Sequence, residues 1–339
     1  MADFLKILDG EALANISVQF DYKNATADFV GLKLFPMVKT PNLKVAIYNL
    51  TKGAAVPVIA LVHAFDSEAR IGDRPNYTEI KAELLLIKEK INQGEEIRKK
   101  VRDMGMDSSE RSILEAIYDD ISNEIAKVLT AFERRACEAL STGKCVVDEN
   151  GAKVTIDFGL DAGNKVDFTG WSAPTHDIIA DIASLKVASK NKIVRQIVSS
   201  KLLGYMLANE KLNAFATAQN LPMTQDFVTN YVSNALGIEV IVDDRTFKTA
   251  YQGGKEYRFF DEDTVISLTT RGTVGQTLMT STPTEDASKT DAKYGFVAVH
   301  QWTDNDPYTS WTKAEGVGLP VFADINNTLY LSKIGQSGE

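Results

Sequence analysis

Apolar residues recur every three or four positions between about Ser108 and Thr142, which is the spacing of one face of an α-helix. The apolar positions are Ile113, Leu114, Ile117, Ile121, Ile125, Val128, Leu129, Phe132, Ala136 and Leu140. Charged residues from Glu115 to Arg134 fill the positions between them. At about 1.5 Å per residue, the helix is roughly 45–50 Å long before it ends at Gly143. We therefore expect a spine through an elongated subunit rather than a wall around a pocket.

Before this helix the pattern predicts strands, an irregular segment and a second helix. Residues 43–50 and 56–62 are rich in β-branched and aromatic side chains and predict a hairpin. Residues 63–77 show neither a helical nor a strand period, which favours a partner-binding arm over a surface loop. Residues 78–103 carry apolar side chains at helical spacing and predict a helix interrupted at Gly94.

After the long helix, short helices and strands alternate. Asn150 and Gly151 lie between two β-rich runs and predict a hairpin over 144–158, because both residues tolerate positive φ. Helices are predicted over 176–186, 191–208 and 224–236, with an N-cap at Thr175 and a stop at Gly237. Strands are predicted over 238–242, 245–251, 255–260, 265–269, 296–302, 310–311 and 329–332, an exposed loop over 273–290 and an apolar turn at 320–322. This mixture of helices and antiparallel strands in two lobes indicates the α+β class.

Composition and charge narrow the function. The 339 residues are 44% hydrophobic and 24% charged, which is ordinary for a globular protein. The net charge is −9 and no basic block occurs, which argues against direct recognition of duplex nucleic acid. The most apolar run, residues 56–62, is too short to cross a bilayer, and the N-terminal residues do not resemble a signal peptide. We expect a soluble intracellular product with no membrane contact.

No catalytic motif stands out. The histidines His63, His176 and His300 are expected to be structural or solvated. Cys137 and Cys145 suit two buried apolar side chains better than a disulfide or half of a metal site, because no CxxC motif occurs. We therefore predict no catalytic, cofactor-binding or metal-binding residues, and we expect a structural subunit.

Three groups of residues leave an alternative open. The acidic groups at 119–120, 243–244, 261–263 and 304–306 could bind a hard cation, although turn chemistry explains them more simply. Trp171, Trp302 and Trp311 could form a ligand platform, but core or interface anchors are the more usual role. Residues 272–275 resemble a phosphate-binding glycine loop only superficially, since no lysine follows.

Several short motifs occur in a particular order along the chain. They are Leu34–Phe35–Pro36 before the 44–50 strand, Ile71–Gly72–Asp73–Arg74–Pro75 before residues 79–91, Phe132–Glu133–Arg134–Arg135 and Thr142–Gly143–Lys144 at the end of the long helix, then 157–159, Trp171, Pro174, 177–178, 264–266, 275–277, 282–285 and 319–321. In this order they resemble the lambda-like major head protein (phage capsid protein E) family of tailed bacteriophages. The resemblance extends over nearly the whole chain.

The resemblance implies the Hong Kong 97-type phage capsid fold. Its parts would be an N-terminal arm at 1–35, an extended loop at 36–78, a peripheral domain with the spine helix at 79–175 and 291–339, and an axial domain at 176–290. The implied function is a major capsid protein that self-assembles into pentamers and hexamers. These would form the icosahedral head shell of a virion around packaged viral DNA.

The resemblance also implies partners. The main partner would be the chain itself, with an arm over about residues 51–77 lying on the neighbouring subunit's spine. Arg70, Asp73 and Arg74 are the candidates for ion pairs between subunits, where charges set register more than affinity. A separate scaffolding protein and a portal are implied, a decoration protein is left open, and double-stranded DNA would be enclosed without sequence-specific contacts. Assembly would take place in the host cytoplasm, and no cofactor is expected.

Three alternatives remain open. A shell protein of a cellular nanocompartment would have the same fold and enclose a cargo enzyme instead of DNA. A tail or sheath component would form tubes, and a soluble enzyme with an unrecognised site would form a small oligomer. The sequence does not determine triangulation number, host, maturation trigger, covalent cross-linking or proteolytic processing.

Overall fold

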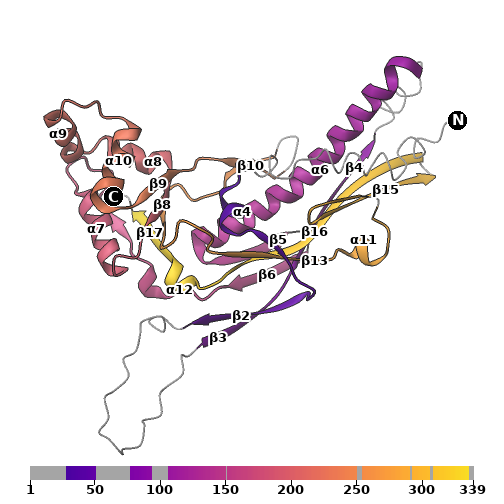
Figure 1. The fold of residues 1–339 in the computed structure, drawn as a ribbon, viewed down its shortest axis with the longest axis horizontal. Helices are drawn as coiled ribbons and strands as arrows, with labels where there is room; N and C mark the ends of the chain where they lie inside the picture. The colour runs from indigo at the N-terminus through magenta and orange to yellow at the C-terminus, as the bar shows by residue number, and fades with distance from the viewer. Residues whose placement is uncertain are drawn as a thin grey trace, which may run out of the picture. The chain divides into compact units, whose positions relative to one another are not determined.

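The computed structural model describes residues 28–50, 77–93, 106–149, 151–249, 254–290, 292–305 and 308–335 (Figure 1). The chain divides into two compact units. The first unit comprises residues 1–45, 82–136 and 276–321, and the second comprises 46–81, 137–275 and 322–339. Each unit has its own buried hydrophobic cluster.

The long predicted helix is confirmed as α6, Met106–Thr142. Its apolar positions Ile121, Ile125 and Leu129 are fully buried, as the helical period requires. Gly143 follows the helix with a φ of +71°, a left-handed conformation that ends helices and that glycine adopts without strain.

A six-stranded sheet forms most of the remaining described part of the first unit. Its order is β1 (Met37–Lys39), β13 (Gly275–Thr280), β16 (Tyr308–Phe322), β15 (Val297–Asn305) and β14 (Ala292–Tyr294), and β4 (Leu85–Gln93) also pairs with β16. β16 is long enough to pair antiparallel with β15 and with β4 over the same residues. β1 and β13 run parallel, which the sequence did not predict.

One face of this sheet packs on α6. Val299 and Ala314, which are partners across β15 and β16, belong to the same buried cluster as Leu129. Phe132 lies against two glycines of β16: a Cβ on Gly316 would lie 2.9 Å from Phe132 Cε2. The glycines inside this strand therefore allow helix and sheet to approach closely.

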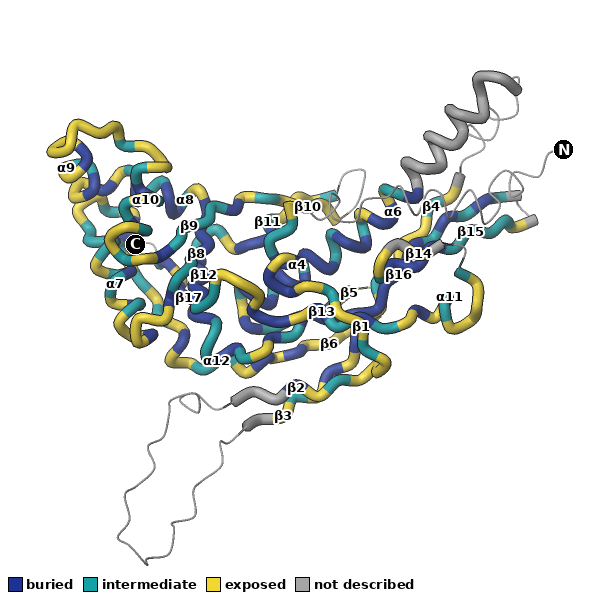
Figure 2. Tube along the Cα trace, viewed as in Figure 1, coloured by how far each residue is buried: buried dark blue, intermediate teal, exposed yellow. Residues whose placement is uncertain are grey.

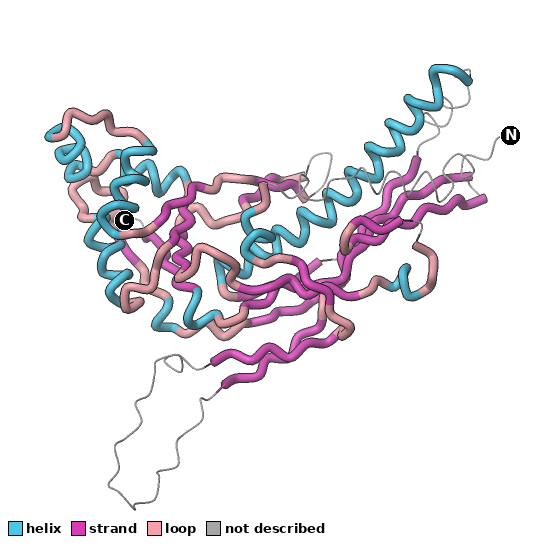
Figure 3. Tube along the Cα trace, viewed as in Figure 1, coloured by secondary structure: helices cyan, strands magenta, loops and turns pink. Residues whose placement is uncertain are grey.

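The predicted helix over residues 78–103 is wrong for the part that the structure describes. These residues form β3 (Tyr77–Glu83) and β4, drawn as strands in Figure 3. Ile87 and Ile91 are four residues apart, which places them on one face of a helix or of a strand alike. Pairing with β16 decides between the two. The predicted strand at 43–50 is confirmed as β2 (Lys44–Leu50), which pairs with β3, whereas residues 56–62 lie outside the described residues.

The largest part of the second unit, among the described residues, is a five-stranded sheet that packs with a group of helices. The sheet order is β7 (Phe168–Thr169), β17 (Leu329–Gly335), β12 (Thr264–Leu268), β8 (Arg195–Val198) and β9 (Glu239–Val242). The helices are α7 (Ile178–Ala188), α8 (Ser200–Leu207), α9 (Glu210–Ala218) and α10 (Gln225–Leu236), and residues from all four share a core with β8, β12 and β17. β8–β9 and β17–β7 are parallel pairs, so the expected antiparallel arrangement is incomplete.

Smaller elements complete the two units. They are α4 (Val30–Leu34), β5 (Lys144–Glu149), β6 (Ala152–Asp157), a 3-10 turn η1 (Ala162–Asn164), β10 (Thr246–Lys248), β11 (Glu256–Arg258), α11 (Pro283–Asp286) and α12 (Ile325–Thr328). β5 and β6 form the predicted hairpin, with Gly151 at a φ of +81° in its turn. β10 and β11 confirm the two strands predicted on either side of 253–254, in shorter form.

Helix boundaries in the second unit follow local capping. α10 is confirmed with its predicted stop at Gly237, which has a φ of +67°, and Thr224, which was expected to be its first helical residue, is its N-cap. α7 starts later than predicted, because the cap is Asp177 and not Thr175. The predicted helix over 191–208 is wrong in its first half: β8 comes first, and Ser199 then caps α8 by accepting from the N–H of Leu202.

Two further expectations are corrected, and one helix was not predicted. Residues 273–290 are not one exposed loop but contain β13 and α11, and residues 320–322 continue β16 instead of forming a turn. The sequence prediction missed α9.

Within the part of the chain that the structure describes, no helix is both long and apolar enough to cross a bilayer.

Candidate functional site

The three residues predicted to form ion pairs between subunits, Arg70, Asp73 and Arg74, lie outside the described residues. Their role stays a prediction. The same applies to His63 and to the irregular segment around it.

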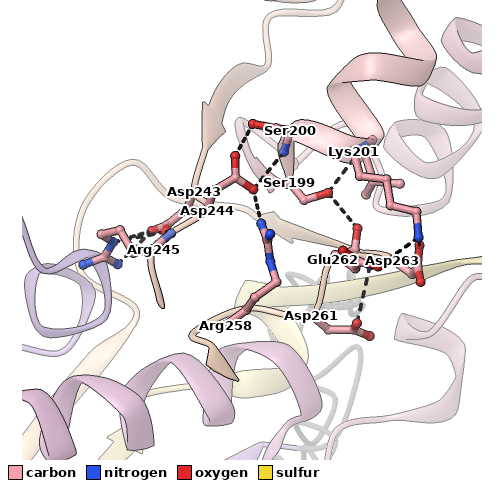
Figure 4. Close-up of polar contacts among 11 residues, drawn as sticks. Ser199, Ser200, Lys201, Asp243, Asp244, Arg245, Arg258, Asp261, Glu262 and Asp263 are labelled. Atoms are coloured by element: carbon pink, nitrogen blue, oxygen red, sulfur yellow. Dashed lines mark hydrogen bonds and ion pairs between the residues drawn. The ribbon is translucent and has the colours of Figure 1, made fainter. Parts of the chain in front are cut away.

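Two of the acidic groups that the sequence singled out lie together in the second unit (Figure 4). Asp243 and Asp244 directly follow β9, and residues 261–263 directly precede β12. β8 and β9 are parallel, and β12 is antiparallel to β8. The end of β9, the start of β12 and the start of α8, which follows β8, therefore lie at the same end of these strands. Long-range strand pairing, not sequence proximity, brings these groups together.

Each acidic residue at this end of the strands, at 243–244 and 261–263, has a cationic or N–H partner. Asp243 accepts from the Arg245 guanidinium at 2.7–3.1 Å. Asp244 accepts from the backbone N–H of Ser200 at 3.1 Å and from the side chains of Ser200 and Arg258. Lys201 lies 3.0 Å from Glu262 Oε1 and 2.8 Å from Asp263 Oδ1.

These contacts shift the pKa values of Asp244 and Lys201 in the direction that favours the charged form of each side chain. Burial alone would raise the pKa of Asp244, but hydrogen bonds from Ser200 and the guanidinium of Arg258 outweigh it and lower the pKa below its usual value. The carboxylates of Asp263 and Glu262 raise the pKa of Lys201. The cluster therefore fixes the starts of α8 and β12 with compensated charges, which supports the turn-chemistry interpretation of these acids.

The structure offers little for metal or acid–base chemistry in the residues that it describes. Among them, no group of three or more His, Cys, Asp or Glu side chains is arranged to hold a metal ion. Asp304 accepts from Trp311 Nε1 at 2.9 Å, and the side chains at 119–120 and at 306 lie outside the described residues. Cys137 and Cys145 are buried and form no disulfide, as the sequence predicted.

The three tryptophans do not form one platform. Trp171 is buried in the second unit, and its Nε1 donates to Asp181 Oδ2 at 2.8 Å, an oxygen that also lies 2.7 Å from His176 Nε2. Trp302 and Trp311 are cross-strand partners in the first unit, with ring centroids 6.2 Å apart. These side chains are packing anchors.

Trp302 and Trp311 belong to a longer aromatic row on β15 and β16. His300 stacks on Trp302 at 5.2 Å between centroids, and Lys90 Nζ lies 4.2 Å from the Trp311 ring centroid. Alternation along the strands places this row on the sheet face opposite to Val299. The row stabilises the far end of the sheet through stacking and cation–π contacts.

A buried carboxylate joins α4 to α6. Glu133 is fully buried, and its two oxygens accept from the backbone N–H groups of Gly31 at 2.9 Å and Leu32 at 2.7 Å. Phe29, which precedes α4, provides no side-chain cap. Glu133 therefore accepts hydrogen bonds from N–H groups at the start of α4 that have no partner within the helix. Its negative charge also interacts favourably with the positive end of the α4 dipole.

Sequence reasoning missed this contact, although the signal was present. Glu133 continues the row Ile121, Ile125 and Leu129 at a spacing of four, so it occupies a core position of α6. A carboxylate at such a position needs buried donors.

A groove of about 390 Å³ is present in the first unit. It is lined by Pro41, Leu43, Glu83, Leu84, Leu86, Thr280, Ser281, Pro283, Asp286 and Val317. The lining contains no histidine or cysteine, and Leu43 and Leu86 are 49% and 43% exposed. Its polar lining consists of the hydroxyls of Thr280 and Ser281 and the carboxylates of Glu83 and Asp286, together with apolar side chains.

Comparison with known proteins gives this architecture a context. The family model described as phage major capsid protein E matches residues 24–331. A crystal structure assigned as a prophage capsid protein of E. coli CFT073 is 17% identical, with a TM-score of 0.63 over 96% of this chain and 99% of that one. A phage-related protein of Bordetella bronchiseptica RB50 is 13% identical, with a TM-score of 0.56 over 95% and 96%. No curated protein matches the chain.

Proposed function

The chain belongs to the phage major capsid protein E family, and from this premise we propose how its copies build a shell. It is a major capsid protein with the Hong Kong 97-type fold, a structural protein of which many copies form the virion capsid. The family match over residues 24–331 is the observation on which the proposal depends.

The shell would be icosahedral and built from pentamers and hexamers. Residues 51–77 would reach over a neighbouring subunit's spine, with Arg70, Asp73 and Arg74 forming ion pairs there. The pairing of β2 with β3 supports this, because it holds the two ends of the segment side by side. Closed symmetry then multiplies individually weak contacts over many copies.

The domain limits are part of the proposal. They are an arm at 1–35, an extended loop at 36–78, a peripheral domain at 79–175 and 291–339, and an axial domain at 176–290. The shared core of α7, α8, α9 and α10 supports the axial domain. β17 lies within the proposed peripheral limits of 291–339, but it pairs with β12, a strand of the proposed axial domain.

Further partners follow from the same premise. A separate scaffolding protein and a portal would take part in assembly in the host cytoplasm, and double-stranded DNA would be enclosed without sequence-specific contacts. The net charge of −9 supports weak contact with DNA, because like charges repel at close range. No catalytic role is required of the subunit. The paired acids at 243–244 and 261–263 agree with this.

The role of the arm is tested by deleting residues 52–73. The deletion removes the proposed contact with the neighbouring subunit and should leave both hydrophobic cores intact, so we expect a folded subunit that forms no shells. Circular dichroism checks folding, and negative-stain electron microscopy checks assembly. A matched control replaces Lys44, a side chain that is 79% exposed, with alanine. Shells of normal size from the deletion variant would refute the role of the arm.

The same images separate the alternatives. Shells that carry a protein cargo and no DNA would favour a cellular nanocompartment. Tubes would favour a tail or sheath component. A small oligomer would favour an enzyme.

A further inference from the structure

Residues 212–238, which include most of α9 and all of α10, are almost free of charge. Asp226 is the only charged residue among them. At the chain's average of 24% charged residues, a stretch of this length would carry about six. The polar residues here are amides and hydroxyls instead. They are Asn213, Thr217, Gln219, Asn220, Thr224, Gln225, Thr229, Asn230, Ser233 and Asn234.

Burial does not explain the lack of charge in this stretch. Five of the six residues that connect α9 to α10 are exposed (Figure 2), and Phe215 and Leu221 are 40% and 47% exposed. Pro222 beside Leu221 is exposed as well. Charge would be the ordinary choice for solubility at such positions.

The exposed apolar residues rest on a rigid base. The Phe215 ring lies 4.8 Å from Tyr231 and 6.4 Å from Phe227, measured between centroids. Val228 and Val232, on the buried side of α10, belong to the core of the second unit. Phe215 is therefore held in place at the surface at little cost in side-chain entropy, as is typical of interface anchors. We call Phe215, Leu221, Pro222, Phe227 and Tyr231 the neutral surface.

Symmetry explains why such a surface lacks charge. In a ring of identical subunits, each charge near the axis is repeated by every copy, and like charges placed together cost several kcal/mol. In a chain with a net charge of −9, copies approach each other at the least electrostatic cost where charge is absent or is paired with an opposite charge. Amide and hydroxyl groups avoid this cost, because they carry no net charge and each can both donate and accept a hydrogen bond, so identical groups can pair with each other.

We propose that the neutral surface is where copies of this chain meet each other within a capsomer. The occupant is a second copy, which contributes the same segment of α9 and α10. This inference rests on the proposed function and specifies which surface the copies use. Other exposed apolar residues differ in their surroundings: Val187 is 69% exposed but follows Lys186 and precedes Lys190 and Lys192.

The test introduces a charge into the neutral surface. Leu221→Asp changes a half-exposed residue in a connection, and Phe215→Asp changes the aromatic anchor. Val187→Asp is the matched control, because it places the same charge on a more exposed apolar residue of the second unit. Purified proteins are compared by analytical ultracentrifugation and negative-stain electron microscopy, and folding is checked by thermal melting.

We expect both variants of the neutral surface to sediment mainly as folded monomers, with at least about a ten-fold loss of shells relative to the wild type and to Val187→Asp. Shells at the wild-type yield from Leu221→Asp would overturn the inference and leave the proposed function intact. An equal loss from Val187→Asp would also overturn it, because the effect would then not be specific. A wild-type chain that forms neither capsomers nor shells would contradict the proposed function itself.

Discussion

Among single residues, Glu315 shows how a buried charge is held in place. Its side chain is 2% exposed, Lys313 Nζ lies 2.8 Å from Oε2, and the backbone N–H of Thr284 donates to Oε1 at 2.8 Å. Burial alone would raise its pKa, but these partners outweigh burial and lower the pKa from 4.5 to about 2. The carboxylate thereby attaches α11 to β16.

The lowered pKa of Glu315 predicts acid sensitivity. A group with a lower pKa in the folded state stabilises the fold above its unfolded pKa, here near 4.5, and that contribution is lost as the pH falls towards 2. We expect Glu315→Gln to lower the free energy of unfolding at pH 7 by at most about 3 kcal/mol. It should also flatten the pH dependence between 4.5 and 2. Urea denaturation of the subunit at several pH values measures both effects.

The control for this experiment is Glu83→Gln, because the Glu83 side chain is 59% exposed and 4.0 Å from Lys44. An exposed pair at that distance contributes little to stability. An unchanged acid profile in Glu315→Gln would show that Glu315 does not carry the predicted effect.

Among secondary-structure elements, α6 was predictable because its period is long and unambiguous. Ten apolar positions, separated by three or four residues apart from the adjacent pairs 113–114 and 128–129, leave no competing interpretation. β5–β6 and α10 were predictable from local chemistry, through Gly151 in the turn and Gly237 at the helix end. In all three cases the information lies within the element itself.

β4 and β8 were mispredicted because their partners are distant in sequence. β4 owes its conformation to β16, more than 200 residues later, and β8 pairs with β9 and β12. Ile87 and Ile91 do not distinguish a strand from a helix on their own. The acids near β9 and β12 were recognised individually, but only the sheet brings them together.

The contact between α4 and α6 is a prediction about two elements. Glu133→Gln keeps the shape but removes the charge that both Gly31 N–H and Leu32 N–H use. We expect a loss of about 1.5–3 kcal/mol in the free energy of unfolding, the range for hydrogen bonds to a charged group. Hydrogen exchange should accelerate at these two amides, which locates the effect.

Glu138→Gln, on the same helix, is the matched control, because its carboxylate accepts from the Val146 N–H at an exposed position. We expect its cost to stay below about 1 kcal/mol. Equal losses in the two variants would contradict a special role for Glu133.

At the scale of the whole molecule, the sequence predicted the protein family better than it predicted the surfaces through which copies contact each other. The order of motifs, from Leu34 to Leu319, was enough to indicate the capsid family that the match over residues 24–331 establishes. The surfaces between copies follow from symmetry and charge, which no single motif encodes. The neutral surface on α9 and α10 is defined by exposure together with the lack of charge, and exposure depends on the fold.

The decisive measurement is negative-stain electron microscopy of the purified wild-type chain, combined with sedimentation velocity. We expect ring-shaped capsomers or closed shells, because contacts between copies would form capsomers, whose closure the proposed scaffolding protein would then guide. A single species no larger than a dimer, at concentrations where capsid proteins assemble, would contradict the proposal that this chain builds a shell.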